Sequence, residues 1–125
     1  MEKGTTISQF GISTTNPLYV KADLMAKKVY EATKNFPRDE MYGLTSQLRR
    51  AALSVILNII EGFARQGVVE FRRFLIISFG SLKETTYLLY FAQQQKYLSV
   101  EAHTQLANHC EELSKIIWTI INPKK

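Results

Sequence analysis

The 125-residue sequence predicts an all-α protein, built as an antiparallel bundle of four long helices. Only six Gly and three Pro interrupt the chain, which favours long elements over a loop-rich β-sandwich. Apolar residues recur three or four positions apart, which is the period of one helix face. The connections between these periodic segments are short, so consecutive helices are predicted to lie side by side in up-down-up-down order.

The first helix is predicted over residues 18–36, with Leu24 and Val29 among its apolar positions. Pro37 ends it, because the residue before a proline avoids the helical region of the backbone. The preceding residues 1–17 are rich in Ser, Thr and Gly, and we expect them to be a flexible lead-in.

The second helix is predicted over residues 41–66 and carries two apolar stripes. The first consists of Leu44, Leu48, Ala51, Val55, Ile59 and Phe63, and the second of Leu53, Ile56, Leu57 and Ile60. A helix that is apolar on two sides must be covered on two sides, and one small bundle can cover only one of them. The second stripe is therefore predicted to pack against another subunit of a homo-oligomer.

The third helix is predicted over residues 68–96 and the fourth over residues 99–122. Ser99 is the predicted N-cap of the fourth helix, because its hydroxyl can accept a hydrogen bond from the first turn. Pro123 stops this helix, so residues 18–122 form the predicted bundle domain and residues 123–125 a basic tail.

The chemistry-bearing residues are few. Cys110 is the only cysteine, and with His103 and His109 it does not make the closed ligand set of a metal site, so no metal or cofactor is expected. The N-terminus lacks the apolar core of a signal peptide, and no apolar run is long enough to cross a membrane. We expect a cytoplasmic protein that does not enter membranes.

Glu61 and Arg65 are four residues apart with the acid first, which favours an ion pair on one helix. Asn58 lies one turn earlier on the same side. With Glu84, these residues are assigned to buried polar or ionic pairing that sets the bundle and its oligomer. A general acid or base at Glu61 is the alternative, but catalysis would need a second titrating group and a pocket. No enzymatic activity is expected.

The basic surplus lies in the middle of the chain. Residues 42–97 carry seven basic and three acidic residues, and so supply +4 of the net charge of +5. Such a surplus attracts polyanions. The candidate phosphate contacts are Arg49, Arg50, Arg72, Arg73 and Lys83, with Lys27 and Lys28 as outer candidates. The alternative is a solvated face whose charge is incidental.

Two segments, YGLTSQLRRAALSVILNIIEGFAR (42–65) and EFRRFLIISFGSL (70–82), resemble a known family. It comprises the small four-helix-bundle proteins encoded in intervening sequences of bacterial large-subunit ribosomal RNA genes, often labelled S23-type ribosomal proteins. The resemblance spans roughly residues 18–120. The sequence departs from the family at the second apolar stripe, where Ile56, Leu57 and Ile60 replace the usual Pro, Ser and Ala. In residues 83–86, Lys-Glu-Thr-Thr replaces Glu-Leu-Glu-Thr.

The resemblance implies a barrel-shaped homo-pentamer whose subunit contacts include the second apolar stripe. A related branch is the accessory variability determinant of diversity-generating retroelements, which binds nucleic acid and a reverse transcriptase. By this resemblance we expect a non-enzymatic accessory protein that contacts RNA or DNA phosphates without sequence preference, with a reverse transcriptase as a candidate partner. The alternative is a homo-oligomeric protein-interaction scaffold that binds no nucleic acid.

Overall fold

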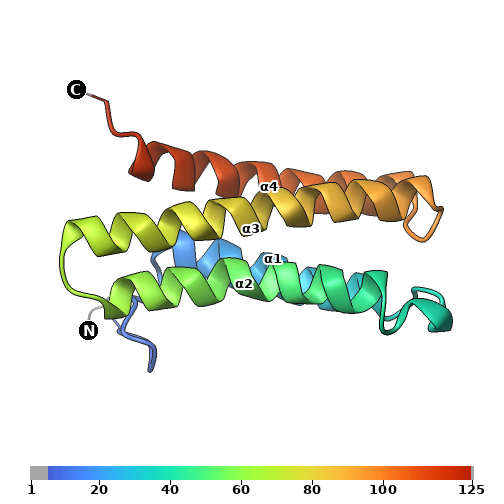
Figure 1. The fold of residues 1–125 in the computed structure, drawn as a ribbon, viewed down its shortest axis with the longest axis horizontal. Coiled ribbons are helices and arrows are strands. Elements are labelled where there is room, and N and C mark those ends of the chain that lie inside the picture. Colours follow the sequence, from blue (N-terminus) through green and yellow to red (C-terminus); the bar gives the residue numbers. More distant parts are fainter. Residues whose placement is uncertain (1–5, 125) are drawn as a thin grey trace.

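A computed structural model describes residues 6–124 and contains four long helices. They are α1 (Pro17–Thr33), α2 (Leu44–Ala64), α3 (Val68–Gln94) and α4 (Val100–Ile121), with a short 3-10 turn, η1 (Arg38–Glu40), before α2. Each helix runs antiparallel to the one before it, and α1 also packs against α4 (Figure 1). The predicted all-α up-down-up-down bundle is confirmed. Within residues 6–124 the only strand-like pairing is an isolated bridge between Ile7 and Ser13.

Local hydrogen bonds explain where the helices begin. Asn16 caps α1 by accepting a hydrogen bond from the Leu18 amide at 2.9 Å, and Pro17 occupies the first helical position, where a missing N–H costs nothing. Ser99 accepts a hydrogen bond from the Ala102 amide at 3.0 Å, which confirms the predicted cap of α4.

Glu40 joins two connections at one end of the bundle and lies at the start of α2 (Figure 1). One carboxylate oxygen accepts a hydrogen bond from the Leu44 amide at 2.9 Å, and the other accepts one from the Tyr97 hydroxyl at 3.0 Å. Tyr97 lies in the turn between α3 and α4, so one side chain ties this turn to the beginning of α2 (Figure 1). The helix α2 begins at Leu44, three residues later than predicted.

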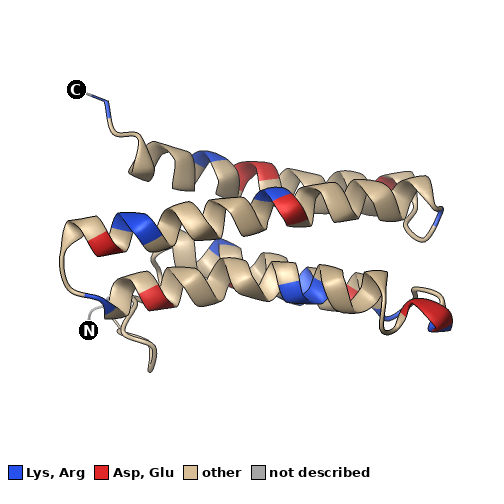
Figure 2. Ribbon diagram, in the orientation of Figure 1, with Lys and Arg blue, Asp and Glu red and all other residues tan. Residues whose placement is uncertain are grey.

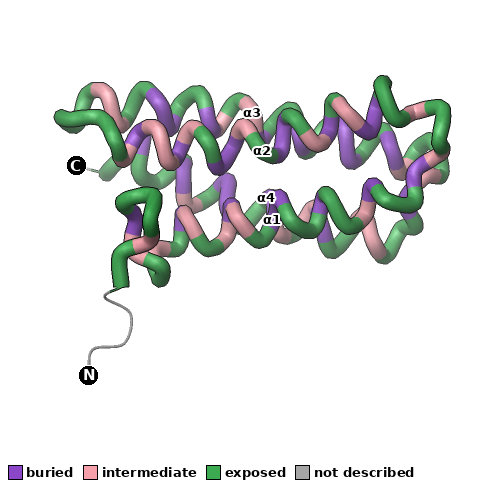
Figure 3. Tube along the Cα trace, turned by 90° about the horizontal axis from the view of Figure 1, so that it is seen from below, coloured by how far each residue is buried: buried purple, intermediate pink, exposed green. Residues whose placement is uncertain are grey.

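The core lies where the four helices face one another (Figure 3). Its largest fully buried side chains include Met25, Leu48, Ile59, Leu75, Leu82, Leu89, Leu113 and Ile117. Ile12 joins this core with only 1% of its surface exposed, although it precedes α1. The predicted flexible lead-in therefore contains a segment that packs on the bundle, and residues 1–5 of the lead-in lie outside the described residues.

Candidate protein-interaction site

An apolar groove runs between α1 and α2, which we call the α1–α2 groove. Ala26 and Tyr30 of α1 and Leu53 and Ile56 of α2 line it, and its volume is about 560 Å³. Its rim is charged: Asp23 pairs with Lys27 at 2.8 Å, and Glu31 pairs with Lys34 at 3.4 Å, each within one turn of α1. The hydrogen bond to Asp23 raises the pKa of Lys27. The groove is therefore apolar inside, and the charged residues at its rim are already paired with one another. Such a groove suits the apolar face of a helix better than a charged ligand.

The four residues of the second apolar stripe of α2 differ in how far they are buried. Ile56 is only 7% exposed and belongs to the core of the single chain, and Ile60 is half-buried against that core. Leu57 is 57% exposed, and Leu53 is also exposed. The prediction that all four residues face another subunit stays a prediction for Leu53 and Leu57, whereas Ile56 is mostly enclosed within one chain and adds only a small exposed edge to the wall of the α1–α2 groove.

A second exposed apolar surface lies on the outer side of α3, which we call the outer α3 face. Ile76, Ile77, Tyr87 and Phe91 are all exposed, and the rings of Tyr87 and Phe91 lie 6.3 Å apart. Gly80 lies between them in sequence, and a Cβ there would meet no atom within 4 Å. The sequence analysis did not assign this surface. The signal was the run FLIISF, because six consecutive residues cover the whole circumference of a helix, so some of these large apolar side chains must face outward.

Four of the seven candidate phosphate contacts are held within the chain. The Arg49 guanidinium donates a hydrogen bond to the Thr33 hydroxyl at 2.7 Å and lies 4.5 Å from the Tyr30 ring centroid. Arg72 donates to the last carbonyl of α4, that of Ile121, at 3.0 Å. Arg73 pairs with Glu70 at 3.2 Å, and Lys27 pairs with Asp23. The hydrogen bond from Arg73 lowers the pKa of Glu70.

Three candidates remain without an acidic partner among residues 6–124. Arg50 and Lys28 are exposed with no ion pair, and Lys83 lies 5.1 Å from the Phe79 ring centroid, also without one. Figure 2 shows basic and acidic positions interspersed along the helices. The single chain therefore does not bring the seven candidates together into one basic surface.

The predicted polar pairs are only partly formed. Glu61 and Arg65 make the ion pair that their spacing predicts, at 2.7 Å, but both side chains are about half-exposed rather than buried. Asn58 donates a hydrogen bond to the Ser54 carbonyl at 2.8 Å, and the Ser54 and Ser81 hydroxyls join α2 to α3 at 2.8 Å.

Glu84 makes no hydrogen bond or ion pair within the described part of the chain. The reason is its position: the residues three and four places away on α3 are Gly80, Ser81, Tyr87 and Leu88, and none is basic. The predicted pairing of Glu84 is therefore absent from the single chain.

Titratable residues do not gather into a ligand set in this bundle. Within residues 6–124, no three His, Cys, Asp or Glu side chains come together as metal ligands would. Burial raises the pKa of the Cys110 thiol to about 11, so it is protonated at neutral pH.

The model of the 23S rRNA-intervening sequence protein family matches residues 15–119, which include α1, α2, α3 and all but the last two residues of α4. The chain belongs to this family. No curated protein matches the chain.

A solved structure of the same kind shares the fold. It is a protein of unknown function from the S23 ribosomal protein family of Bacteroides thetaiotaomicron, with a TM-score of 0.76 and 23% sequence identity. The match covers 84% of this chain and 98% of that one, so the intervening-sequence bundle described here accounts for nearly the whole of the neighbour. None of the helices described in this family member is long and apolar enough to span a membrane.

Proposed function

We propose that this intervening-sequence protein is a non-enzymatic subunit of a homo-oligomer and acts as an interaction scaffold. The observation that carries the proposal is the exposure of large apolar side chains on two separate faces, the α1–α2 groove with Leu57 and the outer α3 face. Monomeric proteins rarely leave contiguous apolar surface open to water.

The occupant of the α1–α2 groove is the outer α3 face of a second copy. Ile76 and Ile77 provide the apolar side chains that a helix-in-groove contact uses, and Gly80 allows the two helix backbones to approach closely. Since the two faces differ, the contact is head-to-tail, and head-to-tail contacts form rings when the rotation closes. The resemblance predicts that the ring has five subunits.

Mixing two variants tests this contact. Leu53→Asp damages the groove side, because Leu53 lines the groove, and Ile77→Asp damages the α3 side, so each variant alone is expected to be monomeric by analytical ultracentrifugation. Mixed in equal amounts, they should form heterodimers and nothing larger, because one intact groove then meets one intact α3 face. Val100→Asp, at an exposed apolar position at the start of α4, is the matched control and should keep the native mass.

Two outcomes would contradict the head-to-tail contact. If Ile77→Asp alone still associates, the groove binds something other than α3. If both variants keep the native mass, the subunits meet on another surface.

Nucleic-acid binding is the second candidate function, and the unpaired cations Arg50, Lys28 and Lys83 favour it. Repetition of a net charge of +5 in each subunit would strengthen attraction to phosphates. Fluorescence anisotropy with labelled RNA and DNA should then show affinity falling by at least about tenfold between roughly 50 and 200 mM salt. An affinity independent of salt would contradict phosphate binding. A reverse transcriptase partner remains a prediction of the resemblance alone.

A further inference from the structure

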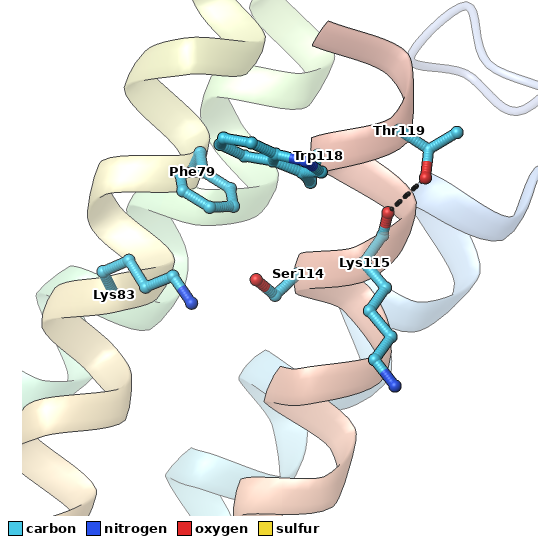
Figure 4. A pocket seen from close by; sticks show the side chains of 6 residues that line it. All are labelled: Phe79, Lys83, Ser114, Lys115, Trp118 and Thr119. Atoms are coloured by element: carbon cyan, nitrogen blue, oxygen red, sulfur yellow. Dashed lines mark hydrogen bonds between the residues drawn. The ribbon is translucent and has the colours of Figure 1, made fainter. Parts of the chain in front are cut away.

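A second hollow lies on the other side of the bundle, between α3 and α4. Its volume is about 440 Å³, within the range of small-molecule sites. Phe79 and Lys83 of α3 and Ser114, Lys115, Trp118 and Thr119 of α4 line it (Figure 4). Two of these residues are basic and none is acidic. The hollow is formed by α3 and α4, whereas the α1–α2 groove is formed by the other two helices.

The walls of this hollow are aromatic and accessible. The rings of Phe79 and Trp118 lie 5.6 Å apart at an angle of 42°, and together they form one side of the hollow (Figure 4). Trp118 is 53% exposed. An exposed indole face held in place by a neighbouring ring is a platform on which a planar group can stack.

Two polar groups lie beside the rings and have no acidic partner within residues 6–124, although the Lys83 ammonium lies 5.1 Å from the Phe79 ring centroid. The Lys83 ammonium makes no ion pair within residues 6–124, and it points across the gap toward the Ser114 hydroxyl (Figure 4). The Ser114 residue is 8% exposed, and its hydroxyl makes no hydrogen bond within the same residues. By contrast, Thr85, Thr86 and Thr119 each donate to the carbonyl four residues earlier. A cation and a free hydroxyl side by side are the donors that a phosphate or carboxylate oxygen accepts.

We propose that the hollow between α3 and α4 binds a planar ring that carries an anionic group, of which a nucleoside monophosphate is the fitting example. The ring stacks on Trp118, and the phosphate accepts hydrogen bonds from Lys83 and Ser114. The same chemistry is offered by a free nucleotide and by a nucleotide within a single-stranded RNA.

The protein carries its own probe for this site, because Trp118 is the only tryptophan. Adenosine monophosphate should change the tryptophan fluorescence saturably, and adenosine, which lacks the phosphate, should bind at least about tenfold more weakly. Inorganic phosphate should compete with the nucleotide without itself stacking on the indole. A short oligoadenylate distinguishes a free nucleotide from a nucleotide within RNA. If the oligoadenylate binds much more tightly than the mononucleotide, the site is assigned to single-stranded RNA. If the two bind equally, the site is assigned to the free nucleotide.

Two lysine variants make the test specific. Lys83→Met keeps the apolar stem of the side chain but removes its charge. It should weaken the affinity for adenosine monophosphate by at least about tenfold. Lys28→Met is the matched control, because Lys28 is an exposed lysine of α1 that does not line the hollow, and it should leave the affinity within about twofold. The proposal is overturned if the nucleotide gives no saturable fluorescence change at millimolar concentration, or if the two variants weaken binding equally.

Discussion

The Cys110 thiol is buried in the core, and this burial changes its acidity. Its pKa rises from 9.0 to about 11, mainly because burial disfavours the thiolate, while the Thr86 hydrogen bond and the Lys83 charge partly oppose the rise. Folding therefore favours the protonated thiol. The stability from this group is fully present below pH 9 and is lost as the pH rises toward 11.

The corresponding measurement is the free energy of unfolding against pH. Between pH 9 and 11 the wild type should lose about 2–3 kcal/mol more than the Cys110→Ala variant, which has no thiol to titrate. Identical pH profiles for the two proteins would mean that the thiol is accessible to water.

Ile56 and Leu57 are adjacent and were assigned the same role from sequence, but the structure gives them different environments. Their apolar character was predictable, whereas the burial of Ile56 depends on how closely α1 approaches α2, which no spacing within α2 reveals. Ile56→Ala should lower the free energy of unfolding by about 2–4 kcal/mol. Leu57→Ala should change it by no more than about 0.5 kcal/mol.

This comparison is best made by urea denaturation in the Ile77→Asp background, where association should not contribute. Equal losses for the two alanine variants would show that Leu57 is as buried as Ile56 within one chain.

At the scale of elements, the sequence predicted all four helices and their order, with ends that differ by at most three residues. The 3.6-residue period and the breaks at Pro37, Gly67 and Pro123 explain this success. The differences arise from tertiary contacts. At the start of α2, Glu40 accepts one hydrogen bond from the Leu44 amide and another from the Tyr97 hydroxyl. Glu40 and Tyr97 are 57 residues apart, so the pattern of neighbouring residues cannot reveal this contact.

Two glycines of the α2–α3 hairpin should respond oppositely to alanine. Gly67 has a positive φ of 95°, so Gly67→Ala should destabilise the protein by about 1–2 kcal/mol. Gly80 lies inside α3 with open space around it, so Gly80→Ala should stabilise the isolated subunit by about 0.5–1 kcal/mol. Thermal denaturation of both variants in the Ile77→Asp background checks the two signs. Destabilisation by Gly80→Ala would mean that another part of the chain packs on this glycine.

At the scale of the whole molecule, the sequence indicated that apolar surface would remain after folding, but placed it only on α2. The outer α3 face was missed because the run FLIISF was read for its helical period alone. The basic surplus follows from the composition, whereas the surroundings of each charge depend on the fold. Arg49 and Arg72 were predicted as phosphate contacts, and in the bundle they serve to hold helices together. Side chains from separate helices determine whether a cation is free, and composition does not contain that information.

Self-association is the central claim, and the native molar mass measured by light scattering across a range of protein concentrations tests it most directly. A single chain has a mass of 14.4 kDa. The account predicts a mass of several whole subunits, with five as the number that the resemblance implies. A mass of one chain at every concentration would contradict it, and would mean that the α1–α2 groove and the outer α3 face are covered by a different protein or not at all.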